Sequence, residues 1–349
     1  DDTADLHRGP GLDAASLPGL LAGEGFHPIA FSAHPWICAG NEGLQDFQRV
    51  VPVSPAADGV SSAYATAGPV VDAAIAWLEE HPDEDTFLYL HLMDTHFPHA
   101  LGPEARAFLG EDAATPLPDP LDERFLRELE RDLTAEERVH LDALVDGSLV
   151  HADAHLGRLL DAMGPARDES LIVVTADHGE HLLEVPGRVG HDGPWYEAVA
   201  RVPLIVHYPP TLGPGVVPEA TSAVDVTPTI VDLLGVEVPD KVRFDGSSLA
   251  DAVADPQHHG AVARLGHVIG AEKCLFEAPR PSPTPFPHLT QEHTGERYDL
   301  RTDPQERTNL WGADPAADQA CRRLHGSLLA DEALRFHSSE RATPLTLPF

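Results

Sequence analysis

Four short apolar runs, separated by segments with helical spacing, constrain the fold of this chain most strongly. They lie at Ile29–Ala33, Thr86–Met93, Leu171–Thr175 and Leu204–His207. Each run is nearly continuous in apolar residues, which is the pattern of parallel strands covered on both faces. Strands that alternate with helices predict a doubly wound, mostly parallel α/β sheet with helices on both faces.

The predicted helices carry start and stop signals of their own. Residues 70–80 have apolar spacing typical of a helix. Thr134 and Glu137 have the spacing of a capping box, which predicts the start of a long helix that ends near Gly164. A further helix is predicted over residues 225–235.

The pattern changes after about residue 250. The proline-rich segment 278–287 is expected to be an exposed, extended loop, and strand-like pieces flank it. We therefore divide the chain into an α/β domain over residues 1–250 and a small C-terminal α+β subdomain over residues 251–349. The subdomain is expected to contain a short antiparallel sheet.

The charge of the chain excludes two classes of partner. With 23 basic and 57 acidic residues, the net charge is −34, which repels nucleic acid and anionic membrane surfaces. No run of about 20 apolar residues predicts a membrane span. Only two basic residues are Lys. An acidic, lysine-poor composition indicates a halophilic protein, and an ordinary acidic protein from a GC-rich genome is the alternative.

The strongest signal for a site is Asp177-His178-Gly179-Glu180, which directly follows the third apolar run. Open α/β sheets bind ligands at the carboxyl ends of their strands, and Gly179 allows a sharp turn there. Adjacent carboxylate and imidazole groups suit a divalent cation. Alternatively, Asp177 caps a following helix and His178 packs in the interior.

Histidines in two other segments are candidates for the same edge of the sheet. His96 and His99 follow the second predicted strand, and His191 lies in a loop flanked by glycines. A histidine in such a place can donate a proton to a substrate anion. Taken alone, each is more often an ordinary packed or surface histidine, since the chain has 21 of them.

Together these segments resemble the sulfatase family of the alkaline phosphatase superfamily. The resemblance rests on the Asp177–Glu180 motif, on Gly190-His191, and on several longer segments in family order, which cover most of residues 15–312. These longer segments are residues 153–161, 196–206, 224–235 and 298–310.

The resemblance implies a role for each candidate residue. Asp177 and His178 match the second pair of metal ligands of the family, usually for Ca²⁺ in sulfatases. His96 matches the histidine that contacts the sulfate or the leaving-group oxygen. His191 falls where many members carry Lys or His against the sulfate. The implied activity is hydrolysis of small-molecule or glycan sulfate esters.

The front of the family pattern is not recognisable in this sequence. It would comprise an Asp-Asp pair, a Cys- or Ser-x-Pro-x-Arg motif that yields the formylglycine nucleophile, and a Lys and His pair. Cys38 is not followed by Pro-x-Arg. We therefore expect this chain to be a fragment of a longer enzyme, with its nucleophile upstream, and incomplete as a catalyst by itself.

Two other functions remain open at this point. One is a phosphatase, phosphodiesterase or phosphonate hydrolase of the same superfamily, for which an Asp-His pair would hold Mn²⁺ or Zn²⁺. The other is a non-catalytic remnant that binds a metal or an anion. The three cysteines are too few for a disulfide framework, and they lack the spacing of a zinc site. Few cysteines and no visible anchor favour the cytoplasm, whereas the oligomeric state is not indicated.

Overall fold

The computed structural model describes most of the residues between positions 16 and 323. The proline-rich segment 278–287 and Cys38 lie outside the described residues. The described ranges are 16–34, 37, 44–54, 65–110, 112–185, 187–191, 196–217, 221–240, 242–244, 246–254, 268–269, 272–276 and 295–323.

The first sheet is parallel and three-stranded, with β1 (His27–Ser32) between β2 (Arg49–Pro52) and β3 (Thr86–His91). Five of the six residues of β1 are buried, and its Ile29 and Phe31 pack in the core with side chains of the helices. Within the described residues β3 pairs with β1 alone, and none of its residues is fully buried. The predicted strands β1 and β3 are confirmed, whereas the short β2 was not predicted.

The second pair of strands, β4 (Ile172–Thr175) and β7 (Leu204–His207), is antiparallel. Both strands were predicted, but the expectation of parallel pairing is wrong for them. Side chains alternate along β7 between partly buried and exposed, and Ile205 is 58% exposed. The expectation that β7 is covered on both faces is therefore wrong too, and apolar continuity does not report the direction of the neighbouring strand.

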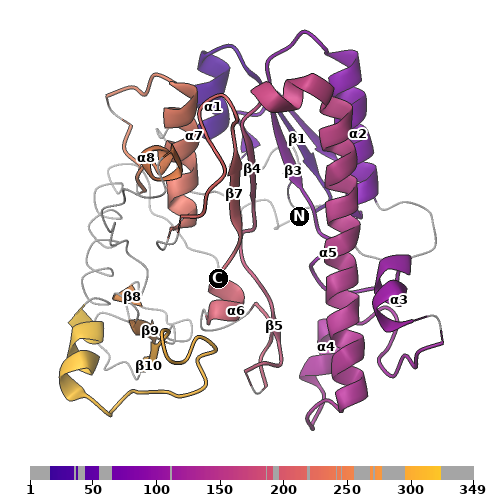
Figure 1. Ribbon diagram of the computed structural model, residues 1–349, viewed down its shortest axis with the longest axis vertical. Helices are drawn as coiled ribbons and strands as arrows, with labels where there is room; N and C mark the ends of the chain where they lie inside the picture. Colours follow the sequence, from indigo (N-terminus) through magenta and orange to yellow (C-terminus); the bar gives the residue numbers. More distant parts are fainter. Residues whose placement is uncertain are drawn as a thin grey trace, which may run out of the picture.

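Helices cover both sides of the strands, so the fold is α/β as predicted. Helices α2 (Ala67–Glu80) and α5 (Ala135–Met163) lie on one side, and α1 (Leu17–Gly23) and α7 (Val226–Leu234) lie on the other (Figure 1). The core between the sheet and the first pair of helices includes Ile29, Phe31, Val70, Val71 and Leu159.

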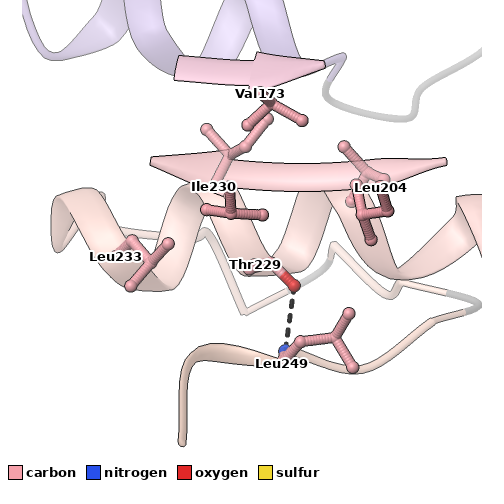
Figure 2. A pocket seen from close by; sticks show the side chains of 8 residues that line it. Val173, Leu204, Thr229, Ile230, Leu233 and Leu249 are labelled. Carbon is pink, nitrogen blue, oxygen red and sulfur yellow. Dashed lines mark hydrogen bonds between the residues drawn. The ribbon is translucent and has the colours of Figure 1, made fainter. Parts of the chain in front are cut away.

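Helix α7 packs against the β4–β7 pair through apolar side chains. Ile230 of α7 lies beside Val173 and Leu204 (Figure 2), and the cavity they line holds only about 10 Å³. This volume is at the lower limit for one water molecule, so the site is a packed interface. Gly235 ends the helix in the left-handed conformation, at φ 66°, as the sequence predicted.

Helix α5 begins and ends as predicted. The hydroxyl of Thr134 accepts a hydrogen bond from Glu137 N at 3.2 Å, and the Glu137 carboxylate accepts from Thr134 N at 2.8 Å. The helix ends at Gly164. It packs closely on α3 (Pro103–Leu109), and Gly147 allows this because it has no side chain. A Cβ at this position would lie 2.6 Å from the backbone nitrogen of Ala105.

The C-terminal residues form an antiparallel sheet of β8 (Val268–Ile269), β9 (Glu272–Phe276) and β10 (Gly295–Asp299). A disulfide joins Cys274 of β9 to Cys321 in a helical segment. The cysteine count predicted only that a framework of several bridges is absent, and this single bond was not predicted. The domain boundary at residue 250 stays a prediction.

The remaining elements connect these parts. No helix in the described ranges is both long and apolar enough to cross a bilayer. The connecting elements are α4 (Glu123–Arg127), η2 (Gly164–Glu169), β5 (His181–Leu182), β6 (Val189–Gly190), α6 (Glu197–Ala200), η3 (Ala223–Asp225) and α8 (Ala250–Ala254).

Candidate functional site

Histidines and carboxylates gather where β3 and β4 end. His96 follows β3, Asp177 and His178 follow β4, and His191 follows β6. The His191 ring lies 4.1 Å from the His178 ring and 5.5 Å from the His96 ring, measured between centroids. The structure therefore brings the four predicted site residues into one neighbourhood, although they come from three separate segments.

The turn after β4 holds Asp177 and His178 side by side. Oδ2 of Asp177 lies 3.6 Å from Nε2 of His178. Nδ1–H of His178 donates a hydrogen bond to the carbonyl oxygen of Gly179 at 3.0 Å, so Nε2 is the ring nitrogen that carries the lone pair. The alternative in which Asp177 caps a helix is wrong, because the chain continues into β5.

This pair of residues fits a divalent cation in part. The two candidate ligand atoms are close enough to bind one ion, and the Asp177 side chain is 76% exposed, so an ion could reach it. Two ligands are only part of a coordination shell. Further ligands would have to come from other groups or from water.

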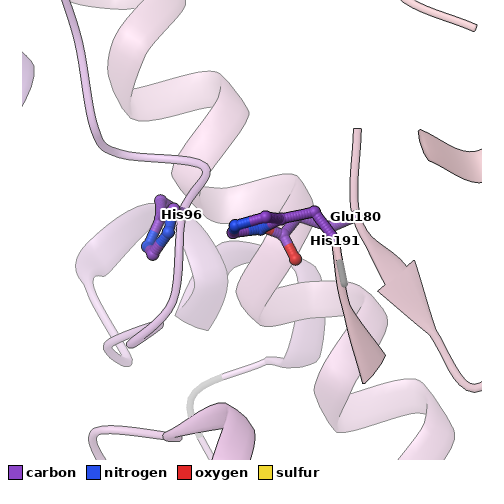
Figure 3. A group of neighbouring side chains, drawn as sticks. All are labelled: His96, Glu180 and His191. Carbon is purple, nitrogen blue, oxygen red and sulfur yellow. The ribbon is translucent and has the colours of Figure 1, made fainter. Parts of the chain in front are cut away.

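A second group consists of His96, Glu180 and His191 (Figure 3). Nδ1 of His191 lies 2.9 Å from Oε1 of Glu180, and Nδ1 of His96 lies 2.5 Å from the carbonyl oxygen of Phe97. Both acceptors fix the ring orientation. Glu180 is 13% exposed, and its Oε2 is buried without a hydrogen-bond partner.

Two further histidines at the ends of β1 and β3 were not singled out from the sequence. Burial lowers the pKa of His91 and His34, and repulsion from the nearby imidazole of His96 lowers both further; the Asp177 carboxylate acts in the opposite direction on the pKa of His91. Their rings lie 6.1 Å apart. The position of His91 in the predicted strand was a usable signal, whereas His34 had none.

Burial and the Asp177 charge also raise the pKa of Tyr89. Because Asp177 acts on both Tyr89 and His91, the ends of β3 and β4 are electrostatic neighbours, as expected for ligand-binding strand ends.

His99 does not belong to this group. It is 1% exposed, its Nδ1 lies 3.2 Å from the Ser148 hydroxyl, and its ring packs edge-on against Phe97. The residue that sequence reasoning passed over is Glu180. It was part of the strongest motif, but only the pairing of β5 with β6 shows that it faces His191.

Comparison with known proteins identifies the same family from a family model and from a curated relative. The family described as Sulfatase matches residues 6–236. The chain is 30% identical over 219 residues to arylsulfatase D of Homo sapiens, a match that covers 58% of this chain and 30% of that protein. The chain therefore spans about a third of the length of this curated relative.

Two solved structures share the fold. One is the phosphonate monoester hydrolase of Agrobacterium radiobacter, with a TM-score of 0.61 and 20% identity over 91% of this chain and 80% of that one. The other was solved in complex with its substrate D-glucosamine-2-N,6-O-disulfate, with a TM-score of 0.54 and 18% identity over 95% and 83% of the two chains.

Proposed function

The chain belongs to the sulfatase family, and on that basis we propose that it forms part of the active site of a hydrolase of sulfate monoesters. The observation that carries the proposal is the gathering of His96, Asp177, His178 and His191 where β3 and β4 end. Ligands of α/β sheets bind at this edge.

In this proposal, Asp177 and His178 are two ligands of a divalent cation, which sulfatases generally use, and which we propose to be Ca²⁺. The exposed Asp177 carboxylate and the Nε2 atom of His178 are the binding atoms. When bound, such an ion neutralises the charge of the sulfate oxygens. Binding of an anionic substrate depends on this neutralisation, because the net charge of −34 would otherwise repel the substrate.

His96 and His191 are assigned to the substrate. Phe97 O fixes the ring of His96 through Nδ1, and Glu180 fixes the ring of His191 in the same way. With Nδ1 engaged in this way, Nε2 is the nitrogen of each ring assigned to the substrate. A protonated imidazole there can donate to a sulfate oxygen or to the leaving oxygen of the ester.

Hydrolysis also needs a nucleophile, and none of these residues supplies one. The proposal therefore requires a Cys- or Ser-x-Pro-x-Arg motif, processed to formylglycine, in the same natural polypeptide. The substrate class we propose is a small-molecule or glycan sulfate ester. The shared fold with a protein solved on a sulfated glucosamine is consistent with the second of these.

A second candidate function is hydrolysis of phosphate or phosphonate esters. It is favoured by the His96, Glu180 and His191 group, whose ligand atoms are of the type that Zn²⁺ and Mn²⁺ prefer. A non-catalytic chain that binds a metal or an anion is the third possibility.

The decisive experiment reads the natural gene in frame upstream of the Asp1 codon and assays its full product on 4-nitrophenyl sulfate and 4-nitrophenyl phosphate. We expect the Cys or Ser motif and preferential sulfate hydrolysis. A Thr nucleophile with preferential phosphate hydrolysis would favour the second candidate. A stop codon just upstream of a true start would overturn catalysis by this chain.

Variants of the same product test the residue assignments. We expect His96→Gln and His191→Gln to lower kcat/KM for the sulfate ester by about 100-fold each, in the range of a lost general acid. His207→Gln, at an exposed histidine on β7, is the matched control and should leave kcat/KM unchanged. Equal activity in all three variants would refute the assignment of His96 and His191.

A further inference from the structure

We propose that Lys273 of β9 is a positioning residue, which holds helix α6 and, through α6, the turn that carries Asp177 and His178. In Figure 1, α6 lies between the β4–β7 pair and the C-terminal sheet that contains Lys273. The inference deepens the proposed function, and it rests on that proposal for the role of the turn in binding a cation.

The Lys273 side chain is buried between two carboxylates. Its Nζ lies 2.8 Å from Oε1 of Glu197 and 3.1 Å from Oε1 of Glu306. The side chain of Lys273 is 5% exposed and that of Glu306 is 2% exposed. A lysine is almost never buried to this extent unless it is paired, and a buried pair is screened little by salt. Lys273 therefore fixes Glu197, the first residue of α6, relative to β9.

Glu306 holds the same end of α6 through its other oxygen. Oε2 accepts a hydrogen bond from the backbone N–H of Glu197, one of the N–H groups at a helix start that lack a partner within the helix. Burial raises the pKa of Glu306, whereas the Glu197 amide and the Lys273 ammonium lower it. Lys273 therefore favours the ionised form of the carboxylate that accepts from α6.

The backbone of Glu306 also indicates a position held by its surroundings. Its φ is 53°, a left-handed conformation that residues other than glycine rarely adopt. Such a conformation persists where the neighbouring contacts determine it. The contacts with Lys273 and with the start of α6 are of that kind.

The neighbouring strand β10 holds the residue just before α6. The Tyr196 hydroxyl donates a hydrogen bond to Oε2 of Glu296 at 2.6 Å, and the Tyr298 hydroxyl donates to the same oxygen at 2.7 Å. The rings of the two tyrosines pack edge-on, 6.0 Å apart. Two paired strands of the C-terminal sheet therefore hold two consecutive residues, Tyr196 and Glu197.

Helix α6 in turn holds the turn after β4. The N–H of Gly179 donates to the carbonyl oxygen of Val199 at 2.8 Å. A side chain at Gly179 would overlap the carbonyl oxygen of Ala198, so the turn and α6 meet backbone to backbone. Gly179 directly follows Asp177 and His178. A shift of α6 therefore moves the backbone from which both proposed cation ligands extend.

A cation site is sensitive to small displacements of this backbone, because ligand distances are kept to within about 0.2 Å. Groups that orient the ligands without touching the ion change its affinity by about 10- to 100-fold. Removal of Lys273 would leave the Glu197 and Glu306 carboxylates facing each other without a cation between them. Their repulsion would push the start of α6 away from Glu306.

The experiment measures amide hydrogen exchange at Gly179 in the full natural product. Lys273→Met removes the cation. Glu197→Gln removes the partner on α6 and leaves Lys273 paired with Glu306, so this second variant keeps the buried charges balanced. In both variants we expect exchange at Gly179 to become faster by about 10-fold or more relative to exchange in β1, which reports opening of the whole domain.

Asp318→Asn is the matched control. The Asp318 carboxylate forms a buried ion pair with Arg297 at 3.0 Å in the same C-terminal part of the chain, and it also accepts from Gly312 N. Its loss should leave the relative exchange at Gly179 unchanged. Equal acceleration in Asp318→Asn would overturn the inference, because any lost buried pair would then loosen the turn. Unchanged exchange at Gly179 in both Lys273→Met and Glu197→Gln would overturn it too.

Titration of the same proteins with Ca²⁺ by calorimetry separates this inference from the proposed function. We expect the Kd for Ca²⁺ to weaken by about 10- to 100-fold in Lys273→Met and Glu197→Gln, and to stay unchanged in Asp318→Asn. If the unmodified product binds Ca²⁺ and both variants keep its Kd, the inference fails and the proposed function stands. If the unmodified product binds no Ca²⁺ while exchange at Gly179 responds as expected, the proposed cation role fails and the positioning of the turn by Lys273 stands.

Discussion

Nδ1 of His191 lies 2.9 Å from Oε1 of Glu180, although eleven positions separate the two residues. The pairing of β5 with β6 explains the contact. His181 is opposite Gly190 in this antiparallel ladder, so Glu180 and His191 are the next facing pair. A two-residue ladder thus positions a carboxylate and an imidazole at the edge of the candidate site.

The first prediction concerns this contact. Glu180→Ala removes the acceptor for Nδ1, so His191 should change from a single Nδ1–H tautomer to a mixture of tautomers. The ¹⁵N chemical shifts of the imidazole ring measure this directly. His207→Gln serves as the control, and an unchanged His191 tautomer in Glu180→Ala would show that another group orients the ring.

The second prediction concerns pH and His99. Burial lowers the pKa of His99 to about 4, with a smaller contribution from His96. The unfolded chain protonates this residue near pH 6.5, whereas the folded chain does so near pH 4. Stability should therefore fall as the pH drops from about 6.5 to 4, by up to about 3 kcal/mol.

Urea denaturation of the wild type and of His99→Gln at several pH values tests whether His99 causes this loss of stability. The variant should show a smaller loss of unfolding free energy between pH 6.5 and 4 than the wild type. Parallel pH profiles for the two proteins would mean that His99 is not protonated differently in the folded and unfolded states.

The third prediction concerns the disulfide between Cys274 and Cys321. The bond closes a loop between residues separated by 47 positions, so removing it should cost about 3–4 kcal/mol in the chain-entropy account. We expect Cys321→Ser to expose β9 to proteolysis and to lower the thermal midpoint. Equal protease sensitivity of the oxidised and reduced chain would contradict this.

The same bond bears on the cellular location. Disulfides persist in oxidising compartments and are rare in the cytosol. Formation of the Cys274–Cys321 bond in the cell would argue against the cytoplasmic location expected from the sequence. Alkylation of free thiols before lysis, followed by mass spectrometry, measures whether the bond is present.

The fourth prediction concerns salt. A net charge of −34 destabilises the compact state through repulsion between carboxylates, and salt screens that repulsion. We expect the thermal midpoint to rise by at least about 10 °C between about 0.1 M and 2 M KCl. Sucrose at equal osmolality is the control. An equal rise in sucrose, or none in KCl, would refute salt adaptation.

Much of the fold could be predicted because its signals are local. The capping box at Thr134, the glycine after α7 and the apolar runs of β1 and β3 each lie within a few neighbouring residues. The antiparallel direction of β7 could not be predicted in this way, because it depends on which strand lies beside it.

The candidate site also combines residues that are adjacent in the sequence with residues that only the fold brings together. The sequence by itself determined that Asp177 and His178 stand together after a strand, since neighbouring residues at a strand end share one edge of the sheet. Their catalytic and metal-binding roles, and those of His96 and His191, stay predictions. Only the tertiary structure decided that Glu180 faces His191 and that His96 lies beside both, because hydrogen bonds and strand pairing, which act across distant positions, bring these side chains together.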